Sequence, residues 1–389
     1  MIDVEALRRD TPSCARMIHF NNAGASPMPN PVLESVTRHL AREAEIGGYA
    51  AEAEAEKQIE DFYDAFATLL NCRRTEIAYV ENATRAWDMV FYAIPFRPGD
   101  RILTAPSEYA SNYIAFLHMA RVRGVGIDVA PVDETGQVDV KGLEAMITPV
   151  TRLIAITHVP TQGGLVNPAA AIGAVARRAR VLYLLDACQS AGQMPLDVQA
   201  IGCDFLSGTG RKFLRGPRGT GFLYVRGELL ADLHPPFVDM HAARWSARDE
   251  YLLRADARRF ENWESHVAGR VGLARAVRYA LDIGLDAISE RTERLAERLR
   301  QGLAAIPGVE VCDLGARKCA IVTFRRAGED PTQTWKRLEA AGISCSVTNT
   351  HSARLDLESR AIERLVRLSV HCFNTEEEVD RACAAVAAQ

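Results

Sequence analysis

Short apolar and β-branched runs alternate with longer amphipathic stretches between residues 77 and 225. This alternation is typical of strands in a mostly parallel sheet that are joined by crossover helices. Several of the runs are apolar throughout, as expected for strands covered on both faces. The pattern therefore predicts an α/β fold. The expected strands are residues 77–80, 101–105, 126–132, 152–159, 181–187 and 221–225.

The pattern changes after about residue 258. Residues 266–303 are rich in Ala, Arg, Glu and Leu at helical spacing, which predicts one long helix linking two domains. The remainder mixes strand-like segments (308–314, 319–326, 343–348 and 365–371) with helix-like segments (331–342 and 375–388). We therefore predict a large domain over residues 16–257 and a smaller α/β domain over residues 258–389, with residues 1–15 packing on the smaller one.

Length and composition agree with two globular domains. A chain of 389 residues exceeds what one hydrophobic core usually supports. Hydrophobic residues make up 48% and charged residues 25%, the balance of an ordinary globular protein. Met1 to Arg16 lacks the uninterrupted apolar stretch of a signal peptide, and no apolar run approaches bilayer length. We expect a cytoplasmic protein without membrane contact.

Net charge and cysteine content limit the kinds of partner and bound group that we expect for this protein. The formal net charge is −4 and no Lys/Arg run compensates for it locally, so we expect no nucleic-acid partner. The nine cysteines form no Cys-x-x-Cys pair, which favours reduced thiols that pack as small hydrophobic residues. We expect no metal site.

The strand predicted over residues 181–187 contains Asp186 at its carboxyl edge. Open α/β sheets bind their ligands at this edge, and a carboxylate there requires a cationic partner. For an isolated aspartate, a helix cap or a surface acid would be the simpler interpretation. The sequence downstream favours a functional role instead.

Residues 207–225 place a lysine between a hydroxyl-rich loop and a Gly-rich turn that leads into a strand. Backbone amides and hydroxyls in such loops suit a bound phosphate. Thr209 and Arg211 could contact the phosphate of a cofactor and Lys212 its aldehyde. A solvated surface lysine is the alternative, and it weighs about equally for this short motif alone.

A second candidate phosphate turn lies at residues 81–88, where Ala83, Thr84 and Arg85 would open a helix after the strand 77–80. Amide groups at a helix N-terminus, with a nearby hydroxyl, form an anion site. Alternatively, Asn82 or Thr84 is simply the N-cap of that helix.

Taken together, these motifs resemble the class V aminotransferase family, the fold-type I pyridoxal-phosphate (PLP) enzymes that include cysteine desulfurases. The resemblance runs almost end to end. It rests on NNAGASPMPNPVLESV (21–36), DETGQVDVKGLEAMITPVTRLIAITHV (133–159), LLDACQSAGQMPLDVQAIGCDFLSGTGRKFLRGPRGTGFLYV (184–225) and RLSVHCFNTEEEVDRA (367–382).

The resemblance implies roles for individual residues. Lys212 would carry PLP as a Schiff base, Asp186 would pair with the pyridine nitrogen, and Gln189 would lie near the phenolic oxygen. Tyr109 stands where the desulfurases stack a histidine on the ring, and we count it as catalytic. The other implied cofactor contacts are Ala83, Thr84, Arg85, Thr161, Thr209 and Arg211.

The same resemblance implies which residues bind the substrate. Arg367 matches the arginine that holds the α-carboxylate of the amino acid, a task suited to a planar bidentate donor. Asn21 and Asn22 are further substrate candidates. Additional lining candidates, for which packing is an equal alternative, are His158, Trp245, Trp263 and His351.

Three departures from the desulfurases matter. Arg211 replaces a histidine before the lysine. The Gly-Thr-Pro segment through which the partner subunit reaches the phosphate is NWES (262–265) here, which leaves Ser265 as a guess for that contact. The loop after Val347 has no cysteine, and Cys345 lies in a strand-like segment, so a mobile reactive thiolate is not expected.

Within the family, the sequence most resembles the carbon-sulfur lyases that cleave hercynylcysteine sulfoxide in ergothioneine biosynthesis. We therefore expect a PLP-dependent carbon-sulfur β-lyase that acts on a cysteine S-conjugate or its sulfoxide and releases pyruvate and ammonia. The alternative is another class V reaction: decarboxylating oxidative deamination of an S-conjugate, cysteine desulfuration, transamination or epimerisation. By resemblance we also expect a homodimer.

Overall fold

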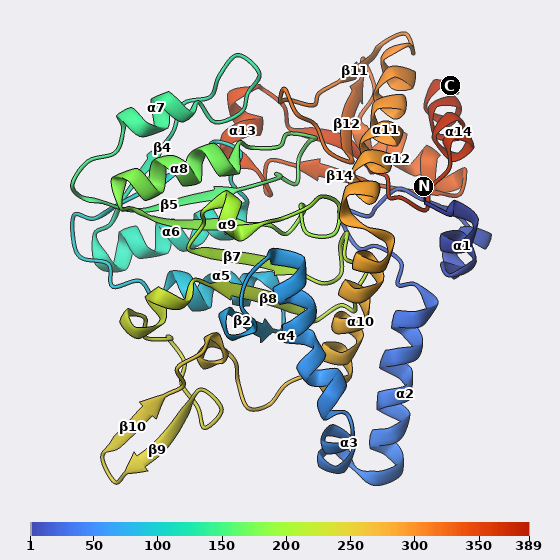
Figure 1. The fold of residues 1–389 in the computed structure, drawn as a ribbon. Coiled ribbons are helices and arrows are strands. Elements are labelled where there is room, and N and C mark those ends of the chain that lie inside the picture. The colour runs from blue at the N-terminus through green and yellow to red at the C-terminus, as the bar shows by residue number, and fades with distance from the viewer. Residues whose placement is uncertain (1, 389) are drawn as a thin grey trace.

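The computed structural model describes residues 2–388 and is built around a seven-stranded sheet (Figure 1). The strand order is β2-β8-β7-β6-β5-β3-β4. The strands are β2 (Ile77–Val80), β3 (Arg101–Thr104), β4 (Gly126–Val129), β5 (Thr151–Thr157), β6 (Leu182–Asp186), β7 (Phe205–Thr209) and β8 (Gly221–Val225). Only β8 runs against its two neighbours. The predicted α/β fold with a mostly parallel sheet is confirmed.

Helices cover both faces of this sheet because the side chains of its strands alternate between two apolar cores. Tyr183 and Leu185 of β6 face one core, whereas Leu184 between them faces the other. The first core is closed by α4 (Glu56–Leu70), α8 (Ala169–Ala179) and α10 (Val267–Ile283). The second is closed by α5 (Ala83–Phe91) and α6 (Ala110–Arg123). Two short helices, α7 (Val140–Ala145) and α9 (Val198–Ile201), lie in the connections.

Strand β7 is the one member of the large sheet that the sequence pattern did not predict. Its residues, FLSGT, read as the hydroxyl-rich loop before Lys212. Gly208 is required in this strand because the ring of Phe222 on β8 occupies the place of a side chain: a Cβ there would lie 2.3 Å from the ring. Packing across the strands thus outweighs the weak strand propensity of Ser and Gly.

The long helix predicted over residues 266–303 is two helices. It breaks at Gly284, whose φ of +94° is readily available only to glycine, and continues as α11 (Leu285–Ala304). Helix α10 packs with α2 (Asn30–Ile46) and α4, and α3 (Gly48–Glu54) connects those two (Figure 1). Residues 2–388 also contain four 3-10 turns: Pro12–Ala15, Arg74–Glu76, Gly227–Asp232 and Ala257–Phe260.

The C-terminal part forms a second, antiparallel sheet of order β11-β12-β15-β14. Its strands are β11 (Val309–Val311), β12 (Ile321–Arg326), β14 (Ser346–Asn349) and β15 (Arg364–Ser369). Its apolar core includes side chains of α11, α12 (Pro331–Ala340) and α14 (Glu376–Ala387), and α13 (Arg354–Ser359) follows β14.

The segment predicted as one strand over residues 343–348 is divided between two sheets. β13 (Ile343–Ser344) pairs with β1 (Ile18–His19), and β14 pairs with β15. Cys345, between them, is buried.

The N-terminal helix α1 (Val4–Arg9) is held against the C-terminal elements. Arg8 donates to the carbonyl of Phe373 at 3.2 Å and to the carboxylate of Glu378 at 2.7 Å. The division into domains at residue 257 stays a prediction. An unanticipated hairpin, β9 (Ala243–Ala247) and β10 (Glu250–Leu253), projects from the body of the protein (Figure 1). Over the described residues, no helix has the length and apolar character needed to cross a membrane.

Candidate active site

One pocket lies at the carboxyl edge of the large sheet. Strands β2, β3, β5, β6 and β7 all point toward this edge, because β8 alone is reversed, so the segments that follow them converge. The pocket is lined by Asn82, Ala83, Thr84, Tyr109, Thr157, Val159, Thr161, Asp186, Cys188, Gln189, Thr209, Arg211 and Lys212. The sequence-predicted pair Asp186 and Lys212 therefore shares one cavity.

Asp186 is held rigidly at the end of β6. It is buried, and its Oδ1 accepts a hydrogen bond from the backbone amide of Cys188 at 2.8 Å. Its Oδ2 accepts one from Nδ2 of Asn112 at 2.9 Å. A carboxylate fixed on both oxygens keeps a defined direction toward the pocket, where a cationic group would pair with it.

Lys212 faces the same pocket from the turn after β7. Burial lowers its pKa, and the guanidinium groups of Arg211 and Arg367 act in the same direction, opposed by the Asp186 carboxylate. A lowered pKa increases the fraction of neutral amine at physiological pH. The neutral amine is the form that attacks an aldehyde and accepts a proton.

The turn predicted at residues 81–88 does open a helix, and its binding of a phosphate stays a prediction. Asn82 is the N-cap of α5, and its Oδ1 accepts from the amide of Arg85 at 2.9 Å. The capping alternative therefore holds for Asn82, while Ala83 and Thr84 at the start of the helix line the pocket, with Thr209 also in its wall. Backbone amides at the N-terminus of a helix are suited to binding an anion.

The structure corrects the prediction for the side chain of Arg85. Its guanidinium lies 4.4 Å from the centre of the Phe237 ring and donates to Asn262 Oδ1 at 3.3 Å, so it is directed away from the pocket. Phe237 and Asn262 are distant from Arg85 in sequence, so tertiary contacts set the direction of this side chain.

The side chains of Gln189 and Thr161 form one wall of the pocket, next to the N-terminal segment at Ala23. Gln189 Nε2 donates to the carbonyl of Ala23 at 3.1 Å and lies 3.4 Å from Thr161 Oγ1. Its Oε1 is buried and has no hydrogen-bond partner within residues 2–388. An orphaned buried acceptor is expected where a bound molecule completes the site.

Arg367 lies directly behind this wall. Its Nη1 donates to Thr161 Oγ1 at 2.6 Å, its Nη2 to Asn21 Oδ1 at 3.4 Å and its Nε to Ser346 Oγ at 3.1 Å. Every acceptor that it contacts in the described chain is neutral. Burial lowers the pKa of Arg367 to about 10, with Arg211 as the next cause, so it remains a cation at neutral pH. A buried guanidinium without an acidic partner favours binding of an anion.

We expect Arg367→Ala to raise KM for an amino-acid substrate about 10- to 100-fold, the cost of losing hydrogen bonds to a charged group, with kcat changed less. Steady-state kinetics would measure the split between KM and kcat. Arg325→Ala, which removes an exposed arginine of the same sheet, is the matched control. An unchanged KM would remove Arg367 from substrate binding.

The two asparagines predicted for the substrate differ in position. Asn21 lies beside Arg367, as described above. Asn22 is turned into the protein: its Nδ2 donates to the carbonyl of Ser369 at 2.7 Å and its Oδ1 accepts from Ser26 Oγ at 2.6 Å. With both ends of its amide engaged, Asn22 connects two segments and is not available to a substrate.

None of the four remaining lining candidates lines the pocket. His158 is buried and absent from the pocket lining, and burial lowers its pKa to about 4, so it is uncharged at neutral pH. Trp245 lies on the exposed hairpin, and His351 lines a separate cavity beside β14. Tyr109, at the N-cap of α6, does line the pocket.

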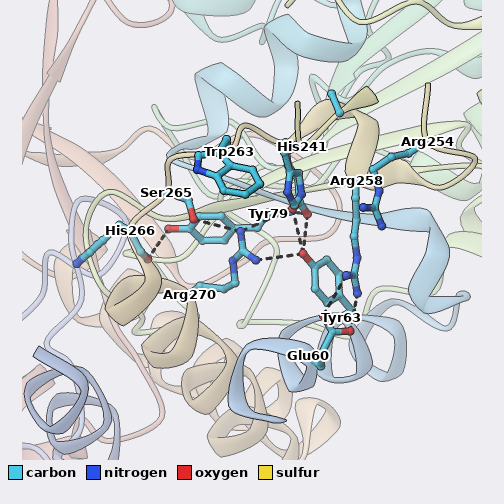
Figure 2. A network of polar contacts seen from close by, with 12 residues as sticks. Glu60, Tyr63, Tyr79, His241, Arg254, Arg258, Trp263, Ser265, His266 and Arg270 are labelled. Atoms are coloured by element: carbon cyan, nitrogen blue, oxygen red, sulfur yellow. Dashed lines mark hydrogen bonds and ion pairs between the residues drawn. The ribbon is translucent and has the colours of Figure 1, made fainter. Parts of the chain in front are cut away.

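The segment in place of Gly-Thr-Pro is anchored by a buried carboxylate network (Figure 2). Glu261 accepts from Tyr63 Oη at 2.9 Å, from the amide of Tyr79 at 2.8 Å and pairs with His241 Nε2 at 3.0 Å. Arg270 donates to Ser265 Oγ at 3.3 Å, which keeps Ser265 close to this network (Figure 2). Trp263 is left half exposed. Ser265 does not line the pocket of its own chain, and its contact with a partner subunit stays a prediction.

Two buried residues behind the pocket wall were not predicted from the sequence. Asn112 bonds to Asp186, and Glu108 bonds to Asn112. No pattern in the sequence indicated them, because Glu108 precedes the first residue of α6 whereas Asn112 lies inside that helix.

The pocket fits PLP. A buried amine, a carboxylate, a helix terminus suited to phosphate and the orphaned Gln189 oxygen surround one cavity. The Aminotransferase class-V family model matches residues 18–382. A probable cysteine desulfurase of Methanothermobacter thermautotrophicus is 31% identical over 96% of this chain and 95% of its own length. Another from Xylella fastidiosa (strain 9a5c) is 32% identical over 99% and 95%.

Two solved structures have a closely similar fold. The apo cysteine desulfurase of Thermococcus onnurineus NA1 superposes with a TM-score of 0.93 at 26% identity, covering 100% of this chain and 98% of that one. The cystine C-S lyase C-DES, in complex with its product cysteine persulfide, has a TM-score of 0.87 at 26% identity, covering 97% and 99%. The chain therefore belongs to the class V aminotransferase family and is a PLP-dependent enzyme.

Proposed function

We propose that the protein cleaves the carbon-sulfur bond of a cysteine-type amino acid and releases the sulfur in a small-molecule product. The observation that carries this proposal is one pocket lined by both Lys212 and Asp186, with Arg367 directly behind its wall. An amine, a carboxylate and a guanidinium in this arrangement provide a cofactor anchor, a counter-ion and a carboxylate clamp.

When bound, PLP supplies an electron sink that stabilises negative charge at the substrate Cα. The neutral amine of Lys212 is positioned to remove the Cα proton, a role supported by its lowered pKa. Arg367 would hold the α-carboxylate, and the Asp186 carboxylate would pair with the protonated ring nitrogen. Asn82, Ala83, Thr84 and Thr209 would surround the phosphate.

The arrangement of thiols supports release of sulfur without a protein persulfide. Residues 350–356, after β14, contain no cysteine. Burial raises the pKa of Cys345 to about 12, so this thiol is neither exposed nor ionised at neutral pH. Burial also raises the pKa of Cys188, which lines the pocket, far above neutrality. A persulfide carrier needs an accessible thiolate.

Hercynylcysteine sulfoxide is one possible substrate within this class, but the relatives favour the broader expectation. Their names assign them to cysteine or cystine. The broader alternative, a class V reaction on cysteine that includes desulfuration, thus has more support than the sulfoxide-specific reaction.

Product analysis distinguishes the two outcomes. The purified holoenzyme would be incubated with L-cysteine, L-cystine and an S-alkyl-cysteine sulfoxide, and pyruvate, ammonia and alanine measured. Elimination breaks the Cα–H and Cβ–S bonds, and hydrolysis then gives pyruvate and ammonia. Desulfuration keeps the amino group and gives alanine. We expect pyruvate from at least one substrate, and alanine as the main product would refute the proposal.

Cys345→Ser should leave the rate of pyruvate formation within about twofold, because a buried neutral thiol takes no part in the elimination. The measurement is kcat with the best substrate found above. A loss of more than about 100-fold in a variant that remains folded would indicate a persulfide mechanism.

A homodimer and a cytoplasmic location stay predictions. Large apolar side chains exposed on and near the β9–β10 hairpin support an association surface: Phe237, Met240, Trp245, Tyr251, Leu252 and Trp263. Sedimentation velocity would measure the mass in solution.

A further inference from the structure

A second carboxylate, Glu108, lies behind Asp186 and is not used by the proposed reaction. It follows β3 and is 3% exposed. Its Oε1 accepts from Asn112 Nδ2 at 2.8 Å, from the backbone amide of Tyr109 at 2.8 Å and from Thr157 Oγ1. Its Oε2 accepts from Thr104 Oγ1 at 3.2 Å. Glu108 is thus surrounded by neutral donors from β3, β5 and α6.

Asn112 joins the two carboxylates. Its Nδ2 donates to Glu108 at 2.8 Å and to Asp186 Oδ2 at 2.9 Å. Both hydrogens of one amide are therefore used to bridge two buried acids. Rotation of the Asn112 amide would break both bonds, so Glu108 and Asp186 fix its orientation jointly.

Two buried carboxylates this close favour retention of a proton by one of them. Burial raises the pKa of Glu108 to about 7, and the Asp186 carboxylate adds to the increase against the hydrogen bonds from Thr157 and Asn112. Asp186 is the charged side chain that faces Glu108 from β6; β3, β5 and α6 present Thr104, Thr157 and Asn112.

We infer that Glu108 is a positioning residue of the cofactor site: it acts through Asn112 on the direction of the Asp186 carboxylate, and through the Tyr109 amide on the start of α6. The inference rests on the proposed pairing of Asp186 with the cofactor ring. A merely structural glutamate would stabilise the fold without influencing what Asp186 binds.

A double-mutant cycle on PLP affinity tests this directly. Apoprotein would be titrated with PLP, and the dissociation constant followed by absorbance, for wild type, Glu108→Ala, Asp186→Asn and the double variant. We expect Glu108→Ala to weaken binding about 10-fold in the wild-type background and less than about twofold in the Asp186→Asn background. Equal losses in both backgrounds would show that Glu108 does not act through Asp186.

Three further variants test whether Glu108 acts through its hydrogen bonds. Glu108→Gln keeps an oxygen that can accept from Asn112 and Tyr109, so PLP affinity should stay within about threefold of wild type. Asn112→Ala removes only the bridge, so its effect on PLP affinity should also be smaller in the Asp186→Asn background. This variant takes the place of Glu108→Ala in the cycle if Glu108→Ala fails to fold. Glu76→Gln, at an equally buried glutamate bound to Arg73 instead, is the matched control and should leave affinity unchanged.

A pH measurement gives an independent readout. The folded apoprotein holds a proton on Glu108 up to about pH 7, whereas the unfolded chain loses it near pH 4.5. Stability from this group is therefore present below pH 4.5 and lost as the pH rises to about 7. Relative to Glu108→Gln, the melting temperature of wild type should fall across this window, and parallel curves would overturn the protonation argument. Neither the PLP titration nor the melting measurement uses an amino-acid substrate. Failure of the positioning role of Glu108 can therefore be distinguished from failure of the proposed carbon-sulfur cleavage.

Discussion

Lys212→Ala is expected to abolish both the absorbance of the lysine-bound cofactor and turnover. The pocket lining contains one lysine, in the turn after β7, and burial lowers its pKa, which increases the fraction of the reactive neutral amine. Alanine can neither bond to the aldehyde nor accept the Cα proton, so we expect a loss of at least about 1,000-fold in kcat. The absorbance spectrum of the purified protein and the rate of pyruvate formation measure the two effects.

Lys141→Ala is the matched control, since Lys141 is exposed on α7 and remote from the pocket lining. It should retain the spectrum and the rate. A Lys212→Ala protein that kept both would end the assignment of this lysine, and with it the proposed proton transfer.

Asp186→Asn is expected to lower kcat by about 1,000-fold, corresponding to about 4 kcal/mol of transition-state stabilisation. The substitution keeps the shape of the side chain and removes its charge. The ring nitrogen would then lose its counter-ion in a buried site, where electrostatic interactions are strong. Single-turnover kinetics would show whether the chemical step has slowed while the fold is retained.

Asp204→Asn provides the comparison, because Asp204 lies at the opposite end of the same sheet and pairs with Arg226. It should alter stability more than kcat. If Asp186→Asn were as active as Asp204→Asn, pairing with the ring nitrogen would not be needed for catalysis.

Much of the fold was predictable because its strands are buried on both faces. The apolar runs at β2 and β8 correspond to the predicted residues 77–80 and 221–225. Strand β7 was not predicted from the sequence. Its Ser and Gly residues fit contacts with β6 and β8, above all the Phe222 ring beside Gly208. Such contacts join residues that are distant in sequence and leave no periodic pattern.

The residues of the candidate site also divide into those that the sequence predicts and those that it does not. Asp186 and the turn at Ala83 and Thr84 are recognisable because they lie at the carboxyl ends of predicted strands, which share one edge of a parallel sheet. Thr209 and Lys212 are recognisable from the hydroxyl- and Gly-rich motif around them. The sequence also indicates Arg367, although only through a family resemblance.

The sequence by itself determined the class of fold and, through the family resemblance, the PLP cofactor, whereas the roles of Lys212 and Asp186 stay predictions. Only the tertiary structure decided which neighbouring polar groups turn into the pocket and which turn away. Arg85 stacks on Phe237, Asn22 bonds to Ser369 and Ser26, and Glu108 reaches Asp186 through Asn112. The physical reason is that a polar side chain in a buried environment takes the direction in which its hydrogen bonds are satisfied, and those partners come from other strands and helices.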